Sequence, residues 1–184
     1  MRKLIFAINT TLDGCVDHTK MHPDEETHAY WTGALREAGL QVFGRKTYQL
    51  MVPYWPNVLK DPSATKSDTE FAQAFVSTSK VVFSRSLESV EDKKTRIVRA
   101  DLRDEILRLK QEPGKHILLG GVDVASQLMQ LGLVDEYRFV VGATLAGEGR
   151  RLLDGVSLPQ SLQLKLIDSK FFKSGSVALH YAKA

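Results

Sequence analysis

The chain is poor in cysteine, in long hydrophobic runs and in excess charge of either sign. Its one cysteine, Cys15, excludes an intrachain disulfide and a cysteine-based metal site, which fits a reducing compartment. The net charge of +3 is too small, and the charges are too scattered, to favour a nucleic-acid surface. The apolar N-terminal stretch is interrupted at Asn9, and no run reaches the roughly 20 residues of a membrane span. We therefore expect a cytoplasmic protein that binds neither nucleic acid nor membrane.

The length and composition suit one domain over residues 1–184. Of the 184 residues, 43% are hydrophobic and 26% charged, which is enough to bury a full core. The sequence shows no repeat, no low-complexity tract and no convincing linker. Residues 53–67 are rich in Pro and Ser, and we expect them to form a long loop.

Hydrophobic periodicity and turn residues predict strands that alternate with helices for most of the chain. Helix starts are expected at Asp24, at Asp101 and at a capping box of Ser67 and Glu70, and one helix is expected to stop at Gly39. Strands are expected at 4–8, 40–43, 81–83, 95–99, 116–119, 137–141, 162–172 and 177–181. This order indicates an α/β fold with a mostly parallel central sheet, helices on both faces and antiparallel C-terminal edge strands.

The first candidate site is a pair of glycines between a strand and a helix. Gly120 and Gly121 follow the strand at 116–119, and Val122 and Asp123 begin the next helix. Glycine lets backbone approach a ligand closely, and a helix start offers free N–H groups and a positive dipole end. A tight turn without a ligand is the alternative, because the pair is neither a G-x-G-x-x-G motif nor a Walker A loop. With the flanking strand and helix, the pattern favours a phosphate site.

The second candidate repeats this layout with two cations. Gly44 ends a strand, and Arg45, Lys46 and Thr47 open a helix. Cations at a helix N-terminus oppose the helix dipole, and a bound anion would remove that conflict. The alternative is a pair of solvated side chains at a surface helix start.

The third candidate is Ser84 with Arg85, directly after the strand at 81–83. Arg and Ser together suit a phosphate monoester, such as the 2′-phosphate of NADP, although a lone Arg after a strand is usually a surface charge. Ligands of such sheets bind outside the carboxyl ends of the strands. The three segments together therefore suit a ligand with several phosphates, such as a dinucleotide.

Other candidate sites are weaker. His18, His22 and His28 lie close in sequence but form no helical i,i+4 pair with a carboxylate, so we expect no metal site. Tyr54 and Trp55 suit either a substrate lip or a packing anchor. No Ser-His-Asp or Cys-His arrangement for nucleophilic catalysis is evident.

Short motifs stand along the chain in a specific order and spacing. They are Thr11-Leu12-Asp13-Gly14, Phe43-Gly44-Arg45-Lys46-Thr47-Tyr48, Tyr54-Trp55-Pro56, Lys80-Val81-Val82-Phe83-Ser84-Arg85-Ser86-Leu87, Leu118-Leu119-Gly120-Gly121, Gly132-Leu133-Val134-Asp135-Glu136-Tyr137 and Gly147-Glu148-Gly149-Arg150-Arg151-Leu152. With these motifs, nearly the whole chain resembles the dihydrofolate reductase-like family. Within that family it is similar to the branch of the bacterial riboflavin-biosynthesis reductase domain and small stand-alone reductases.

The resemblance implies a three-layer α/β/α fold and an NADPH-dependent reductase, commonly a homodimer. It assigns the cofactor phosphates to the same three segments. Thr27 departs from the family, because folate-reducing members carry a carboxylate there, before an aromatic pair that is Tyr30-Trp31 here; this argues against dihydrofolate as the substrate. Ala143 replaces the usual proline before the Gly-x-Gly segment. We expect no deaminase domain of the kind that often precedes the riboflavin reductase, which counts against that exact role.

The resemblance implies hydride transfer from NADPH to a C=N or C=O bond of a pterin-like, pyrimidine-like or sugar-like substrate. Asp13 is the candidate for substrate contact or proton relay, or alternatively a turn former. Trp31, Tyr48 and Trp55 would line the substrate side. Two other hypotheses remain: a non-catalytic NADPH-binding sensor, suggested by Thr27, and an α/β module for a ligand other than a nucleotide.

Overall fold

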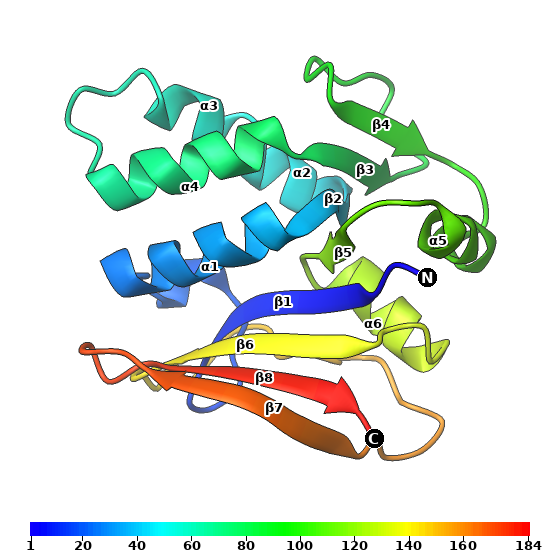
Figure 1. Cartoon of the computed structure of the whole chain (residues 1–184). Coiled ribbons are helices and arrows are strands. Elements are labelled where there is room, and N and C mark those ends of the chain that lie inside the picture. Colours follow the sequence, from blue (N-terminus) through cyan, green and yellow to red (C-terminus); the bar gives the residue numbers. More distant parts are fainter.

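An eight-stranded sheet runs through the middle of the molecule, with helices on both faces (Figure 1). The computed structural model describes residues 1–184. The strands are β1 (Leu4–Thr11), β2 (Ala38–Gly44), β3 (Ser79–Phe83), β4 (Thr95–Val98), β5 (His116–Leu119), β6 (Glu136–Gly142), β7 (Leu164–Phe171) and β8 (Val177–Lys183). The helices are α1 (Glu25–Glu37), α2 (Arg45–Met51), α3 (Tyr54–Val58), α4 (Lys66–Ser77), α5 (Leu102–Gln111) and α6 (Asp123–Gln130), with a 3-10 turn at His18–Lys20.

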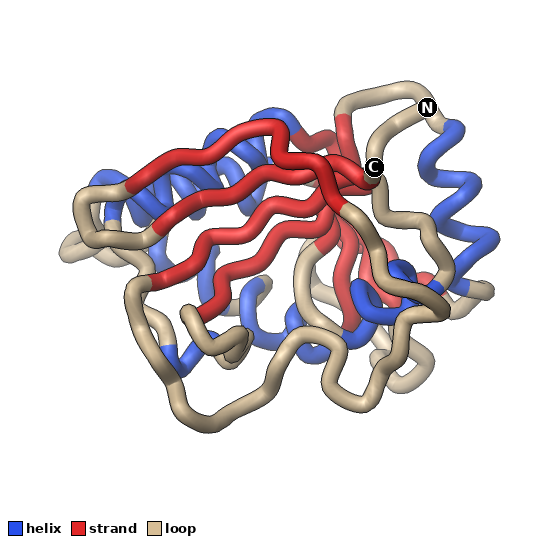
Figure 2. The backbone as a smooth tube through the Cα atoms, turned by 90° about the horizontal axis from the view of Figure 1, so that it is seen from below, coloured by secondary structure: helices blue, strands red, loops and turns tan.

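The strand order is β4-β3-β2-β5-β1-β6-β8-β7, and the strands lie side by side in Figure 2. The six strands from β4 to β6 in this order are parallel to their neighbours. β8 runs antiparallel to both β6 and β7. The predicted mostly parallel sheet with antiparallel C-terminal edge strands is therefore confirmed.

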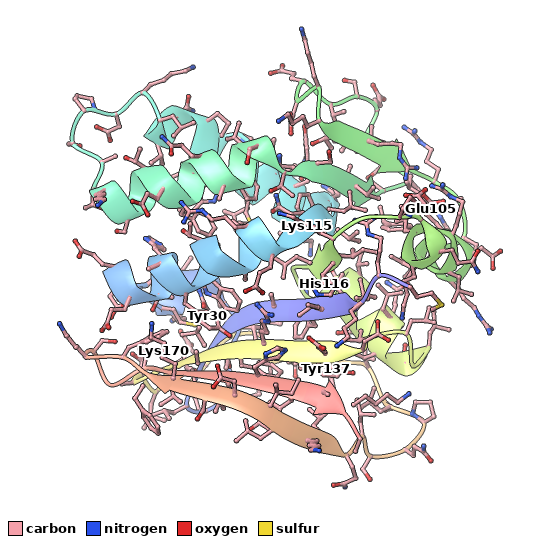
Figure 3. The ribbon with its side chains drawn as sticks, in the orientation of Figure 1. Tyr30, Glu105, Lys115, His116, Tyr137 and Lys170 are labelled. Carbon is pink, nitrogen blue, oxygen red and sulfur yellow. The ribbon has the colours of Figure 1, made fainter.

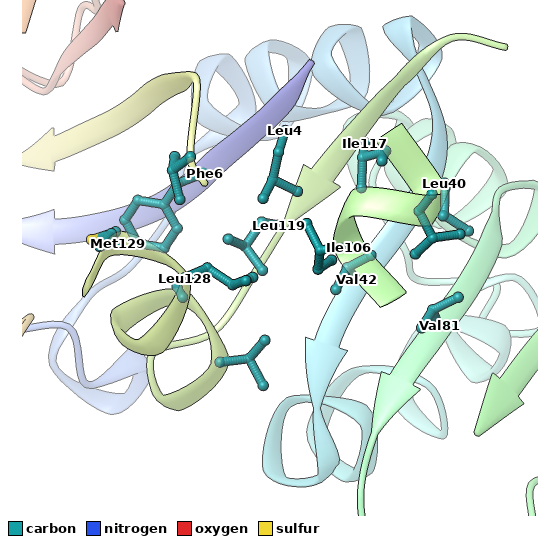
Figure 4. Packing of buried hydrophobic residues seen from close by; sticks show 14 of the residues in the cluster. Leu4, Phe6, Leu40, Val42, Val81, Ile106, Ile117, Leu119, Leu128 and Met129 are labelled. Carbon is teal, nitrogen blue, oxygen red and sulfur yellow. The ribbon is translucent and has the colours of Figure 1, made fainter. Parts of the chain in front are cut away.

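Two cores, one on each face of the sheet, make the three layers. Successive strand side chains point to opposite faces. On one face Leu4 and Val42 pack with Ile106 of α5 in a cluster that also includes α6 (Figure 4). On the other face Phe43 packs in a cluster that includes Phe75 of α4 and residues of α1 and α2. The predicted three-layer α/β/α architecture is confirmed.

The acidic helix caps form as predicted. Asp24 Oδ1 accepts the N–H of Thr27 at 2.8 Å and begins α1. Asp101 Oδ1 accepts the N–H groups of Arg103 and Asp104 and begins α5. No helix is both long and apolar enough to cross a membrane.

Three local predictions were wrong. α1 ends at Glu37 and passes straight into β2, so Gly39 is a strand residue rather than a helix stop, because Ala38 already has extended backbone angles. The capping box does not form, because the hydroxyl of Thr65 accepts the N–H of Asp68 and starts α4 earlier. Residues 53–67 are not wholly a loop, since they contain the single turn of α3.

Candidate functional site

The carboxyl ends of β3, β2 and β5 meet at one edge of the sheet. β2 pairs in parallel with β3 on one side and with β5 on the other. The N–H of Gly120 donates to the carbonyl of Val42 at 2.9 Å, which ties the glycine pair to the end of β2. A Cβ at Gly44 would lie 3.2 Å from Val124 Cγ2, so the start of α2 packs against α6. The predicted segments 44–47, 84–85 and 120–123 are thus brought together, and we call them the cradle.

Neither helix that begins in the cradle has a capping side chain. α2 starts after Gly44 and α6 after Val122, and no side chain accepts their first N–H groups. The longer helices that begin elsewhere are capped by Asp24, Thr65 and Asp101. The free N–H groups and positive dipole ends of the cradle helices are therefore available to an anion.

The two adjacent glycines of the cradle have different surroundings. Gly121 has a φ of +79°, and a Cβ there would collide with the hydroxyl oxygen of Thr47. The turn itself therefore requires glycine at this position. Gly120 has no positive φ, and a Cβ there would meet nothing within 4 Å. The geometry of Gly121 fits the tight-turn alternative, whereas the open space at Gly120 would let a ligand approach the backbone.

The cations of the cradle are exposed. Arg45 reaches only Gln49 of its own helix, at 3.1 Å. Lys46 and Arg85 make no hydrogen bond or ion pair within the chain. Ser84 Oγ accepts the N–H of Leu87 at 2.9 Å, which leaves its own proton free to donate. All these groups could contact phosphate without first breaking a buried interaction.

The structure adds one cation that sequence reasoning missed. Arg150 Nη2 lies 2.5 Å from Asp123 Oδ1, at the first residue of α6. The hydrogen bond from Arg150 holds the pKa of Asp123 below its usual range, and the charge of Lys46 adds to this effect. Arg150 therefore neutralises a carboxylate that would otherwise repel an anion from the cradle. The Gly147–Leu152 motif was its only signal in the sequence.

Asp13 joins two loops. Its carboxylate accepts the hydroxyl of Thr11 at 2.5 Å and the N–H groups of Ala146 and Gly147 at 3.0 and 2.9 Å. These bonds, that from Thr11 foremost, hold the pKa of Asp13 well below its usual range. This geometry favours the alternative of a turn former, and a role as proton relay stays a prediction.

The three predicted substrate aromatics occupy different places. Trp31 Nε1 donates to Asn9 Oδ1 at 2.7 Å, and its ring lies 5.0 Å from that of Tyr30, which Figure 3 labels. Tyr48 is only 8% exposed and belongs to the core, where burial raises its pKa. Trp55 packs on Phe71, with the ring centroids 4.3 Å apart. Of the three, Trp31 contacts Asn9, a residue that lines a cavity at this edge of the sheet.

That cavity has a volume of about 150 Å³ and opens between the ends of β1 and β6, the start of α1 and the β7–β8 turn. Because β1 lies next to β5 and is parallel to it, the cavity and the cradle lie at the same edge of the sheet. Its lining is Asn9, Met21, His22, Pro23, Thr27, Val140, Gly142, Ala143, Thr144, Ser174 and Ser176. A larger hollow of about 430 Å³ lies at the opposite edge, near the ends of α1 and α4, and contains no predicted site residue.

Two of the three candidate histidines contact a carboxylate. His28 Nδ1 lies 2.7 Å from Asp68 Oδ1, and His18 Nδ1 lies 3.8 Å from Asp17 Oδ1. No group of three or more His, Cys, Asp and Glu side chains is arranged to hold a metal ion. The His28 contact joins α1 to α4, and the His18 contact stays within one turn.

Residues 2–178 match the family model of the RibD C-terminal domain. The chain belongs to this family. It is 31% identical to the uncharacterized protein YyaP of Bacillus subtilis over 98% of this chain and 94% of that protein. The RibD C-terminal family and the resemblance stated above agree on a riboflavin-biosynthesis-reductase-like protein.

Solved structures share the fold. A putative riboflavin biosynthesis protein from Shewanella superposes with a TM-score of 0.75 at 18% identity, over 99% of each chain. A deaminase/5-amino-6-(5-phosphoribosylamino)uracil reductase from Thermotoga maritima gives a TM-score of 0.69 at 14% identity, over 100% of this chain and 57% of that one. At these identities the likeness shows a common fold.

Proposed function

We propose that this chain is an NADPH-dependent reductase that transfers a hydride to a pterin-like, pyrimidine-like or related small molecule. The observation that carries the proposal is the cradle, where uncapped helix starts, an open glycine and unpaired cations meet at adjacent strand ends. Membership of a riboflavin-biosynthesis reductase family supports the reaction class. The proposal also assigns the individual cradle residues to the phosphates of NADPH.

The residues of the cradle fit a dinucleotide with a third phosphate. The free N–H groups of α2 and α6, with the open backbone at Gly120, suit the pyrophosphate. Arg85 and Ser84, at the end of β3, suit the 2′-phosphate. When bound, NADPH supplies the hydride, and the chain binds and orients the two reactants. A cofactor lying across β3, β2 and β5 would end beside β1, next to the cavity.

A second candidate is a non-catalytic NADPH-binding sensor. The observation in its favour is Asp13, whose oxygens are occupied by loop contacts and whose lowered pKa makes it a poor proton donor. Binding without turnover would distinguish this candidate from the reductase.

The test is a calorimetric titration with NADPH and NADH, followed by assays of NADPH oxidation with pterin, pyrimidine and quinone-like acceptors. The reductase proposal expects preferential binding of NADPH and oxidation by at least one acceptor. Binding without any oxidation would favour the sensor. If neither dinucleotide binds, both candidates are wrong, and a module for another ligand remains.

We also propose that two copies pair through β7. This edge strand has seven of its eight residues exposed, and Leu166, Ile167 and Phe171 expose 50%, 50% and 78% of their surface. Antiparallel pairing of β7 with its copy would form a two-fold interface and cover the unpaired edge. Sedimentation should show a dimer that Phe171→Glu dissociates, and a monomeric parent protein would contradict this pairing. The cytoplasmic location stays a prediction.

A further inference from the structure

The loop that follows β6 is fixed against the segment that follows β1. We call residues 144–151 of this loop the strap. The N–H of Val16 donates to the carbonyl of Arg150 at 2.8 Å. A Cβ at Gly149 would lie 2.7 Å from the sulfur of the buried Cys15, so the strap backbone packs directly on that side chain. The main chain of Arg150 is therefore held in place, and its side chain is the part that can move.

The Arg150 side chain leaves the strap and reaches the start of α6. Its Nη2 lies 2.5 Å from Oδ1 of Asp123, the first residue of that helix, and this is the only hydrogen bond of the guanidinium within the chain. A guanidinium carries five N–H groups, so four remain available to a ligand. The two side chains are 39% and 52% exposed, and ion pairs as exposed as this one are weak. Arg150 can therefore exchange Asp123 for a stronger partner.

The Asp123 carboxylate lies where the donors to an anion gather. It stands at the N-terminus of α6, which has no capping side chain and whose dipole favours negative charge. The hydrogen bond from Arg150, foremost, and the charge of Lys46 at the start of α2 lower the pKa of Asp123, so both cations act on it. In the free chain, this carboxylate therefore engages the cations that a phosphate group would attract.

We propose that Arg150 binds the pyrophosphate group of a dinucleotide, and that Asp123 holds the guanidinium at the start of α6 until that group arrives. The inference rests on the proposed function and adds to the three cradle segments a binding residue from a fourth, the strap. A pyrophosphate carries two charges and several acceptor oxygens, whereas Asp123 offers one charge. Because NADPH and NADH share this group, Arg150 favours neither cofactor over the other, in contrast to Arg85.

Calorimetric titration of the full chain with NADPH, NADH and inorganic pyrophosphate tests this role. Arg150→Ala should weaken both dinucleotides by the same factor, about tenfold, as expected for the loss of one charge-assisted hydrogen bond to phosphate. It should weaken inorganic pyrophosphate as well. Arg150→Lys, which keeps the charge, should restore part of the affinity.

Arg151→Ala is the matched control. Arg151 is the next residue of the strap and has a similar exposure of 45%, but its guanidinium lies 3.6 Å from Asp13 Oδ2 rather than at α6. This variant should weaken either dinucleotide less than about threefold, because it removes an exposed charge without removing a phosphate contact. Both arginines are half-exposed, so urea unfolding should show that both variants fold as the parent does.

Asp123→Asn separates a direct contact from an effect through the carboxylate. A chain with this substitution has no charge at Asp123 for Arg150 to neutralise, and the ion pair is gone. If Arg150 contacts the pyrophosphate, adding Arg150→Ala to this chain should still weaken NADPH about tenfold. If Arg150 acts only on Asp123, by neutralising it or by tying the strap to α6, the added substitution should change the affinity less than about twofold, which would overturn the inference.

The outcomes also distinguish this inference from the proposed function. If inorganic pyrophosphate binds with the expected dependence on Arg150 while neither dinucleotide binds, the assignment of Arg150 stands and the reductase proposal fails. If NADPH binds and is oxidised but Arg150→Ala and Arg151→Ala weaken it alike, only the assignment of Arg150 fails. If neither pyrophosphate nor a dinucleotide binds, both are overturned.

Discussion

The cradle and the cavity lie at the same edge of the sheet but use different chemistry. The cradle presents backbone N–H groups, glycines and exposed cations at the ends of β3, β2 and β5. The cavity is lined by hydroxyl, amide and apolar side chains and by His22, with no Lys, Arg, Asp or Glu, at the ends of β1 and β6. Backbone groups and cations recognise phosphate, which is common to many ligands, whereas side chains set the shape and polarity for one substrate class. The difference implies that each region can be altered without the other.

The largest expected effect is a loss of stability at Gly121, the cradle glycine that the turn requires. Gly121→Ala forces a side chain into the left-handed region and against Thr47, and should lower the free energy of unfolding by about 3 kcal/mol. Urea unfolding followed by circular dichroism measures this change. A loss below about 1 kcal/mol would show that the turn relaxes and does not require glycine.

The next largest effect is a loss of NADPH affinity at Arg85, where the cradle meets the end of β3. Arg85→Ala should cost about 2 kcal/mol of NADPH binding, roughly a 30-fold weaker affinity, and change NADH binding less than twofold. Arg103→Ala is the control, because Arg103 is also exposed but lies on α5. Calorimetric titration gives both affinities. Equal weakening of NADPH and NADH would refute the assignment of Arg85 to the 2′-phosphate.

A charge cluster on β4 and α5 tests the fold alone. Glu105 accepts from Arg108 and Arg96, and these bonds lower its pKa to about 2 (Figure 3). A lowered folded-state pKa stabilises the protein above the unfolded value, and this contribution is lost as the pH falls from 4.5 toward 2. Glu105→Gln should lower the free energy of unfolding by about 1.5 kcal/mol at neutral pH. The effect is moderate because solvent around the half-exposed arginines partly screens the ion pairs.

Thermal and urea unfolding of Glu105→Gln across this pH range supply the measurement. The difference from the parent protein should shrink in acid, while NADPH affinity at neutral pH stays the same. A difference independent of pH would mean that the carboxylate charge does not stabilise the fold.

The smallest effect concerns the open glycine. Gly120→Ala adds a methyl group where no protein atom lies within 4 Å, so stability should change by less than about 1 kcal/mol. NADPH affinity should fall by about 1 kcal/mol, roughly fivefold, because the methyl group would occupy the proposed path of the pyrophosphate. Unchanged affinity in a stable variant would place the pyrophosphate elsewhere.

The sequence was informative where structure is local. Strands followed by glycine and helix-start residues predicted the cradle, because adjacent parallel strands bring their ends together. The error at the start of α4 arose because two nearby residues can cap a helix. Thr65 lies two residues before Ser67, and its hydroxyl accepts the N–H of Asp68. A short helix such as α3 carries too few residues to show a period.

The cavity could not be predicted in the same way. Its lining comes from segments around Asn9, Thr27, Val140 and Ser174, which only the folded sheet and the β7–β8 turn bring together. Arg150 was missed for the same reason, since its partner Asp123 is 27 residues away in sequence. Tyr48 matched a motif but lies in the core, because a short motif does not show how deeply a residue of the helix is buried.

A crystal structure of the chain with NADP⁺ tests the central claim most directly. We expect the pyrophosphate over Gly120 and the start of α6, the 2′-phosphate at Arg85, and the nicotinamide beside the cavity that Thr27 lines. A dinucleotide bound away from the ends of β3, β2 and β5, or bound there with its 2′-phosphate in solvent, would contradict it.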